Sequence, residues 1–165
     1  ISSLLALLHP SLTDADADTL YHASPMHDIG KMTVPHEILH KAGRLSPDEF
    51  EIMKQHTSNA YRLMSGSRRR LIQAAAIIAH QHHERWDGKG YPQALKGSDI
   101  HIYGRIVALA DVFDALTHKR CYKEAWEARE AVDYIVANRG SHFDPELVDL
   151  FTANVDKFLD IAKLT

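Results

Sequence analysis

Residues 82–92 read His82-His83-Glu84-Arg85-Trp86-Asp87-Gly88-Lys89-Gly90-Tyr91-Pro92, and they join the end of a predicted helix to a long loop. Successive side chains on an α-helix diverge by about 100°, so adjacent histidines cannot share one helix face. At a helix end the backbone can turn, and both imidazoles can then reach a common point. Neutral imidazole is the commonest protein metal ligand. The alternative is a pair of solvated histidines at a helix C-terminus, where positive charge suits the helix dipole.

The segment before these histidines is almost continuously apolar from Leu71 to Ala79, which predicts a buried central helix. His80 precedes His83 by three residues and shares its face. We expect His82 and His83 to be ligands and His80 to be structural or to support them. The loop over residues 84–101 is long for a compact domain, and such loops are usually functional.

Other segments also predict helices. A capping box with proline at the first helical position, Ser46-Pro47-Asp48-Glu49, begins a helix that ends near Gly66. Further helices are expected over residues 2–8, from an Asp14 cap towards Met26, over 102–116, over 127–138, and from Asp144-Pro145 as the last helix. No segment alternates with period two, so the predicted fold is all-α.

Composition limits the classes of function. The 165 residues suit one domain, and 45% hydrophobic content suits a globular core. A formal net charge of −3 gives no bulk attraction to a nucleic-acid polymer or an anionic membrane surface. No apolar run approaches the ~20 residues of a membrane span. The single cysteine, Cys121, excludes an intramolecular disulfide and agrees with a reducing cytosol.

A second candidate segment is His27-Asp28-Ile29-Gly30-Lys31. A histidine beside a carboxylate can bind one cation, and a carboxylate can bridge two. Gly30 allows close backbone approach, and Lys31 offers a point charge to a phosphate oxygen. The alternative is a capped helix end with a surface salt bridge.

Two isolated polar residues complete the candidate set. His56 lies in the middle of a predicted helix, and Asp111 lies within an apolar stretch. A buried unpaired carboxylate is costly, so Asp111 must meet a cation, backbone donors or Arg105. The candidates recur at intervals of roughly 26–30 residues, about one helix plus a loop. Six imidazole and carboxylate groups suggest two or three metals, and nitrogen and oxygen ligands without thiolate favour iron, manganese or zinc.

These motifs together resemble the HD-GYP family, a subgroup of the HD-domain phosphohydrolases. The resemblance runs along the whole chain and is carried by residues 27–31, 45–56, 82–92, 110–117 and 143–147. It implies a multi-helix HD-domain bundle whose long loop carries the Gly-Tyr-Pro sequence and contacts substrate.

The resemblance implies a bacterial, cytoplasmic phosphodiesterase that hydrolyses cyclic di-GMP to linear pGpG, to GMP, or to both. Its implied cofactors are two or three divalent ions, first iron or manganese, with zinc, nickel, magnesium or calcium as alternatives. The ligands it implies are His27, Asp28, His56, His82, His83 and Asp111, with Asp28 bridging two ions.

The same resemblance assigns substrate contacts. Asp28 and Lys31 carry the catalytic roles, in which water attacks phosphorus in line with the leaving ribose oxygen. Lys31, Tyr91, Arg120 and Lys123 contact the phosphates or nearby groups, and Gly88 and Gly90 shape the substrate loop.

The resemblance also implies a larger protein. Residues 1–165 would be an HD-GYP domain without its N-terminal helix, which supplies a further ligating histidine in relatives; neither His9 nor His22 stands at that position. A receiver or sensory domain would precede it, and a homodimer and a diguanylate-cyclase (GGDEF) partner are implied. Two alternatives stay open: a catalytically silent cyclic-dinucleotide sensor, and an HD phosphohydrolase for another nucleotide such as cyclic GMP-AMP.

Overall fold

The computed structural model describes residues 1–118 and 126–162, and within these ranges the chain is helical without a β-strand, apart from one isolated bridge. The all-α prediction is therefore confirmed. The α-helices are α1 (Ser2–Leu8), α2 (Asp14–Ala23), α3 (His36–Leu39), α4 (Pro47–Met64), α5 (Arg70–Gln81), α6 (Ile102–Thr117), α7 (Ala128–Ala137), α8 (Pro145–Ala153) and α9 (Val155–Ala162). Short 3-10 helices are η1 (Ser24–Met26), η2 (Ile29–Thr33) and η3 (Gly97–Asp99). No helix in the described ranges combines the length and apolarity needed to cross a bilayer.

Local sequence signals account for where the helices begin and end. The capping box at Ser46 and Glu49 begins α4 as predicted. At α2 the predicted Asp14 cap is wrong, because Thr13 is the cap and forms a capping box with Asp16. The helix that follows Asp144 is not the last one either. The backbone leaves helical dihedral angles at Asn154, and α9 follows.

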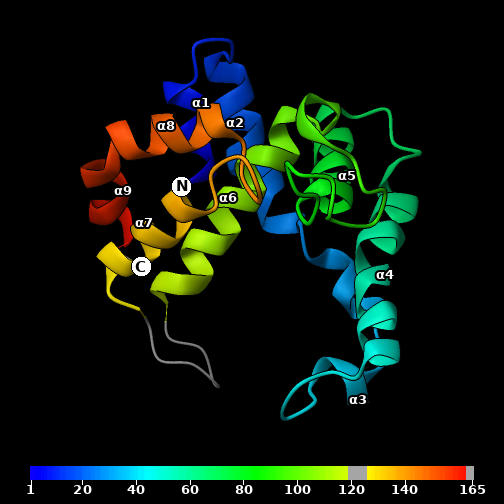
Figure 1. The fold of residues 1–165 in the computed structure, drawn as a ribbon. Helices are drawn as coiled ribbons and strands as arrows, with labels where there is room; N and C mark the ends of the chain where they lie inside the picture. Colours follow the sequence, from blue (N-terminus) through cyan, green and yellow to red (C-terminus); the bar gives the residue numbers. More distant parts are fainter. Residues whose placement is uncertain (119–125, 163–165) are drawn as a thin grey trace.

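Helix α5 lies between α6 and α4 (Figure 1). It packs against α2 and α6 on one side and against α4 on the other, while α3 lies near the start of α4. Helices α7, α8 and α9 cover α6 and α1. The largest fully buried side chains are Phe113, Phe143, Phe151, Phe158, Leu5, Leu20, Ile78, Ile100, Ile106, Leu109, Ile135 and Leu147.

The segment η2 lies directly on α4 at a point where no side chain fits between them. A Cβ atom added to Gly30 would stand 1.9 Å from the carbonyl oxygen of His56. The predicted close backbone approach at Gly30 is therefore present in the structure. It places Asp28, two residues earlier, beside the middle of α4.

Candidate functional site

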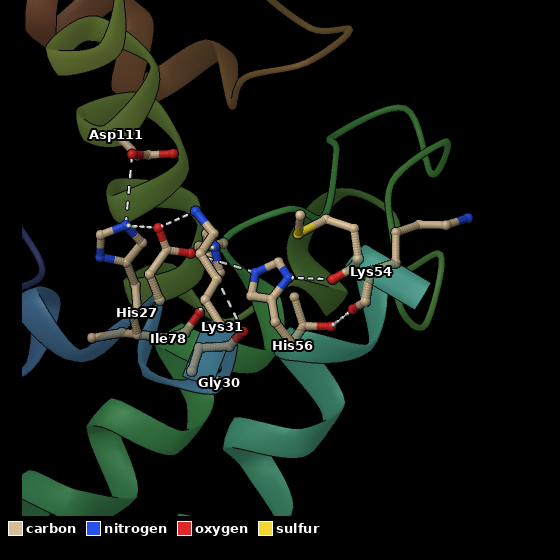
Figure 2. Close-up of polar contacts among 12 residues, drawn as sticks. His27, Gly30, Lys31, Lys54, His56, Ile78 and Asp111 are labelled. Carbon is tan, nitrogen blue, oxygen red and sulfur yellow. Dashed lines mark hydrogen bonds and ion pairs between the residues drawn. The ribbon is translucent and has the colours of Figure 1, made fainter. Parts of the chain in front are cut away.

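Side chains from four separate parts of the chain meet at one point (Figure 2). His27 and Asp28 come from the connection between η1 and η2, His56 from the middle of α4, His82 from the residue that caps the end of α5, and Asp111 from α6. One ligand atom from each of Asp28, His56, His82 and His83 lies within 4.8 Å of the others. We call these four residues, with His27 and Asp111, the ligand cluster.

Asp28 is at the centre of the ligand cluster. Its Oδ1 lies 3.5 Å from Nε2 of His56 and 3.7 Å from Nε2 of His82. Its Oδ2 lies 3.3 Å from Nε2 of His27. The same His27 nitrogen is 3.6 Å from Oδ1 of Asp111, which joins α6 to the cluster. The structure thus brings all six predicted ligands together.

Backbone carbonyl groups orient three of the imidazoles. Nδ1 of His27 lies 2.8 Å from the carbonyl of Ser24, and Nδ1 of His56 lies 2.8 Å from that of Met53. Nδ1 of His82 is 3.1 Å from the carbonyl of Ile78. A carbonyl only accepts, so each Nδ1 donates, and in a neutral ring the lone pair is then on Nε2. Each Nε2 faces Asp28.

The cluster leaves acceptor atoms without donors. Among the described residues, Oδ1 of Asp28, Nε2 of His56 and Nε2 of His82 are buried and have no hydrogen-bond partner. Buried polar atoms are almost always paired, because leaving one unpaired costs about 1–3 kcal/mol. Three lone pairs directed at one point fit a divalent cation, which would satisfy all of them.

The charge state of the cluster also suits a cation. Burial would raise the pKa of Asp28, but His27 and Lys31 outweigh it and hold the pKa far below its usual range. Burial, with His82 and His56 nearby, lowers the pKa of His83 to about 2, so this imidazole is neutral. Burial would lower the pKa of His27, but Asp111 and Asp28 raise it to about 10. His27 would release this proton on binding a cation.

The adjacent histidines meet as predicted. His82 is the C-cap residue of α5, directly after Gln81, and the rings of His82 and His83 lie 3.9 Å apart between centroids. His80 is outside the ligand cluster and stacks on Tyr61, with centroids 4.3 Å apart. Arg105 is not the partner of Asp111, because its guanidinium pairs with Asp144 and with the carbonyl of Ile100.

Of the predicted substrate residues, Lys31 and Tyr91 lie at the cluster. Lys31 donates to Oδ2 of Asp28 at 2.5 Å, and the ring of Tyr91 stacks on His83 with centroids 4.8 Å apart. A Cβ on Gly90 would stand 2.4 Å from the backbone nitrogen of Arg85, so only glycine fits that turn. Gly88 adopts a positive φ of 81°. Arg120 and Lys123 lie outside the described residues.

The loop is held by a residue that the sequence analysis did not single out. Glu84 is 2% exposed, and its carboxylate accepts the backbone N–H groups of Gln93 at 2.7 Å and Leu95 at 3.0 Å. A second attachment joins Trp86 N–H to the carbonyl of His142. The available signal for Glu84 was its position directly after two candidate ligands and before a glycine-rich loop. Its hydrogen-bond partners could not be predicted, because they are backbone groups and no pattern of residue types identifies them.

Two cavities lie on either side of the ligand cluster. One has a volume of about 250 Å³ and is lined by His27, Asp111 and Asp114 with apolar residues. The other has a volume of about 330 Å³ and is lined by Phe50, Lys54, Arg85, Lys89, Gly90, His142, His83 and Tyr91. We call the second one the Lys54 cavity. His83 and His27 thus each connect the cluster to a different cavity.

Comparison with known proteins gives the class of this chain. A model of the HD domain family matches residues 5–147. The chain belongs to the HD domain family, which confirms the resemblance read from its motifs.

Similar proteins include bacterial phosphodiesterases. The chain is 49% identical over 138 residues to the cyclic di-GMP phosphodiesterase response regulator RpfG of Xanthomonas campestris, covering 84% of this chain and 36% of that protein. It is 47% identical over 150 residues to the 3'3'-cGAMP-specific phosphodiesterase 2 of Vibrio cholerae, covering 91% of this chain and 29% of that protein. A cyclic di-GMP phosphodiesterase of Thermotoga maritima is 47% identical, and the match covers 84% of this chain and 38% of that protein. The chain thus spans about a third of the length of these relatives.

A solved structure shares the fold. The cyclic GMP-AMP specific phosphodiesterase V-cGAP3 of V. cholerae superimposes with a TM-score of 0.65, over 98% of this chain and 46% of that one. At 21% identity this likeness concerns the fold alone.

Proposed function

We propose that this chain is the catalytic domain of a phosphodiesterase that hydrolyses cyclic di-GMP to pGpG and GMP in bacterial signalling. The observation that carries the proposal is the set of three buried acceptor atoms, on Asp28, His56 and His82, that face one point without donors. The relatives named as cyclic di-GMP phosphodiesterases support the substrate.

The ligand cluster would hold the cations. Oδ1 of Asp28 faces His56 and His82 whereas Oδ2 faces His27, so its two oxygens suit two different ions. A donor set of imidazoles and carboxylates fits two or three iron or manganese ions. When bound, such ions activate water and compensate charge at phosphorus.

Residues beside the cluster would handle the substrate. The Lys31 ammonium is partly exposed and lies on Asp28, from where it can reach a phosphate oxygen and stabilise the charge that develops there. Burial and the charges of Asp28 and Asp111 raise the pKa of Tyr91 well above its usual value. Its phenol therefore keeps its proton and can donate a hydrogen bond to the substrate.

The test is hydrolysis of cyclic di-GMP by the protein loaded with Mn(II) or Fe(II), with products separated by chromatography. We expect pGpG and GMP, and we expect His82→Ala to lower both bound metal and turnover at least about 100-fold, because ligand loss exceeds the 10–100-fold effect of losing a supporting contact. His22→Ala is the matched control, because this exposed histidine of α2 is not part of the ligand cluster and contacts Asp18 and Tyr21.

Binding without any product would contradict the enzyme and support the sensor alternative. Unchanged metal content in His82→Ala would contradict the centre itself. Cyclic GMP-AMP belongs in the same assay, because one relative at 47% identity is named for that substrate.

A further inference from the structure

The Lys54 cavity has a composition that the metal centre does not explain. We propose that it binds a guanine base of the cyclic dinucleotide and that Lys54 selects guanine over adenine. This inference rests on the proposed function, and it names the part of the same site that determines which base is accepted.

The walls of the cavity suit a flat ring. The Tyr91 ring stacks on His83 and meets Phe50 edge to face, with centroids 6.1 Å apart. Phe50 is 45% exposed, which leaves its ring open to a ligand. Bases of every kind stack on aromatic side chains, because each base has a π face. The rings therefore favour a base without choosing which one.

The charges around the cavity can select guanine over adenine. Three cationic side chains line it, namely Lys54, Arg85 and Lys89, and among the described residues no carboxylate does. Arg85 is engaged by both oxygens of Asp87, at 3.2 and 3.0 Å. Within residues 1–118 and 126–162, Lys54 forms an ion pair with Glu51 alone, whose side chain is 68% exposed, and such an exposed pair contributes little and exchanges readily.

Lys54 is also well placed to meet a base edge. Its Nζ lies 5.4 Å from the centroid of Phe50 and 5.7 Å from that of Tyr91. Figure 2 shows the side chain extending on the side of α4 away from His27 and Asp111. On the same edge both bases present the N7 acceptor, but guanine adds the O6 acceptor where adenine has the N6 donor, so the difference lies at this one position. An ammonium donates to the O6 acceptor and repels the N6 donor.

The position of the cavity agrees with the reaction. His83 belongs to the ligand cluster and also lines the cavity, so a base held there leaves its phosphodiester close to the centre. The other cavity is lined by Asp111 and Asp114, which would repel an acceptor-rich edge. Of the two cavities beside the centre, only the Lys54 cavity has the charge for guanine.

The experiment compares three ligands that carry the same two phosphates and differ only in their bases: cyclic di-GMP, 3'3'-cyclic GMP-AMP and cyclic di-AMP. Binding is measured by calorimetry in EDTA, where turnover is suppressed, and kcat/KM is measured with Mn(II). We expect the wild-type protein to bind cyclic di-GMP at least about tenfold more tightly than cyclic di-AMP, as one charge-assisted hydrogen bond allows. Lys54→Met keeps the side-chain stem over the rings and should remove most of this preference, whereas Lys54→Arg should keep it.

Lys41→Met is the matched control, because Lys41 also pairs with a glutamate of α4 but lines neither cavity. Equal weakening of all three ligands in Lys54→Met would overturn the proposal and place Lys54 on a phosphate instead. Equal binding of cyclic di-GMP and cyclic di-AMP by the wild-type protein would overturn it without any variant. Failure of the proposed function has a different signature: guanine-selective binding without hydrolysis.

Discussion

Two acidic residues beside this centre, Asp28 and Glu84, differ in whether hydrogen-bond donors satisfy their buried oxygens. Glu84 is 2% exposed, and each of its oxygens accepts a backbone N–H group. Asp28 is more open, yet its Oδ1 is buried and faces two imidazole nitrogens that offer no proton. Both residues lie next to candidate ligands in the sequence.

This contrast gives a criterion for distinguishing a structural carboxylate from a metal-binding one: whether hydrogen-bond donors already satisfy its oxygens. A carboxylate whose acceptors are all met stabilises the fold and has nothing left to offer a cation. A carboxylate oxygen that faces imidazole lone pairs instead of N–H groups lowers the stability of the metal-free protein. A bound cation would remove this cost. Glu84 therefore fixes the position of the loop, and Asp28 is the residue we expect at the cations.

The largest expected effect is that of Asp28→Asn on activity. The amide is a poor cation ligand and cannot serve two ions, so hydrolysis of cyclic di-GMP should fall at least about 100-fold, and bound metal should fall with it. The free energy of unfolding of the metal-free protein should change by less than about 1 kcal/mol, because the amide can donate to the unpaired nitrogen of His56 or His82 and so offsets the charge contacts of Oδ2 with Lys31 and His27 that are lost. Elemental analysis and denaturant titration in EDTA measure the two quantities.

Asp18→Asn is the control for this prediction, because Asp18 is exposed on α2 and only meets His22. A large loss of stability in metal-free Asp28→Asn would show that Asp28 is a structural residue like Glu84 and would remove the contrast.

The reverse pattern is expected for Glu84→Gln. One oxygen becomes an amino group that faces a backbone N–H of the loop, so the free energy of unfolding should fall by about 1–3 kcal/mol. The melting temperature should fall by roughly 2–4 °C for each kcal/mol. Bound metal should stay unchanged, while KM rises because Tyr91 loses its fixed position.

The control here is Glu37→Gln, at an exposed position of α3. Loss of metal from Glu84→Gln with an unchanged melting temperature would contradict the assignment of Glu84 to the loop.

The smallest effect is expected at Asp16, a third acidic residue that is fully paired but far from the centre. It accepts Thr13 N–H at 2.9 Å, the Tyr103 hydroxyl at 2.6 Å and Arg70 at 2.9 Å. Asp16→Asn should lower the free energy of unfolding by about 0.5–2 kcal/mol, the usual value of a helix cap. Activity and bound metal should not change, and Asp14→Asn in the same turn is the control.

The stability that Asp16 contributes should depend on pH in a defined direction. Hydrogen bonds from Thr13 and Tyr103, with Arg70 nearby, hold the pKa of Asp16 well below its usual value. A group whose folded pKa is depressed stabilises the protein above its unfolded pKa of about 3.9, and this contribution is lost as the pH falls. The melting-temperature difference between wild type and Asp16→Asn should therefore narrow from pH 5 towards pH 2. A difference that widened on acidification would contradict this origin.

Much of the fold could be predicted from local patterns. The capping box at Ser46, the apolar run before His80 and the absence of alternation predicted helices that the structure contains. The errors came from short-range competition. Thr13 and Asp14 are both good cap residues, and which of them caps α2 depends on the reciprocal contact with Asp16.

The sequence by itself determined the chemistry of this protein: an all-α chain that carries imidazoles and carboxylates at helix-plus-loop intervals, with Gly30 where backbones had to approach. Which of those groups form one site depends on tertiary packing. The distance from Asp28 to His56, the orientation of each imidazole by a carbonyl group, and the pairing of Arg105 with Asp144 instead of Asp111 all depend on contacts between segments far apart in the chain. Residue type sets what a side chain can bind, whereas packing sets whether its neighbours already satisfy it.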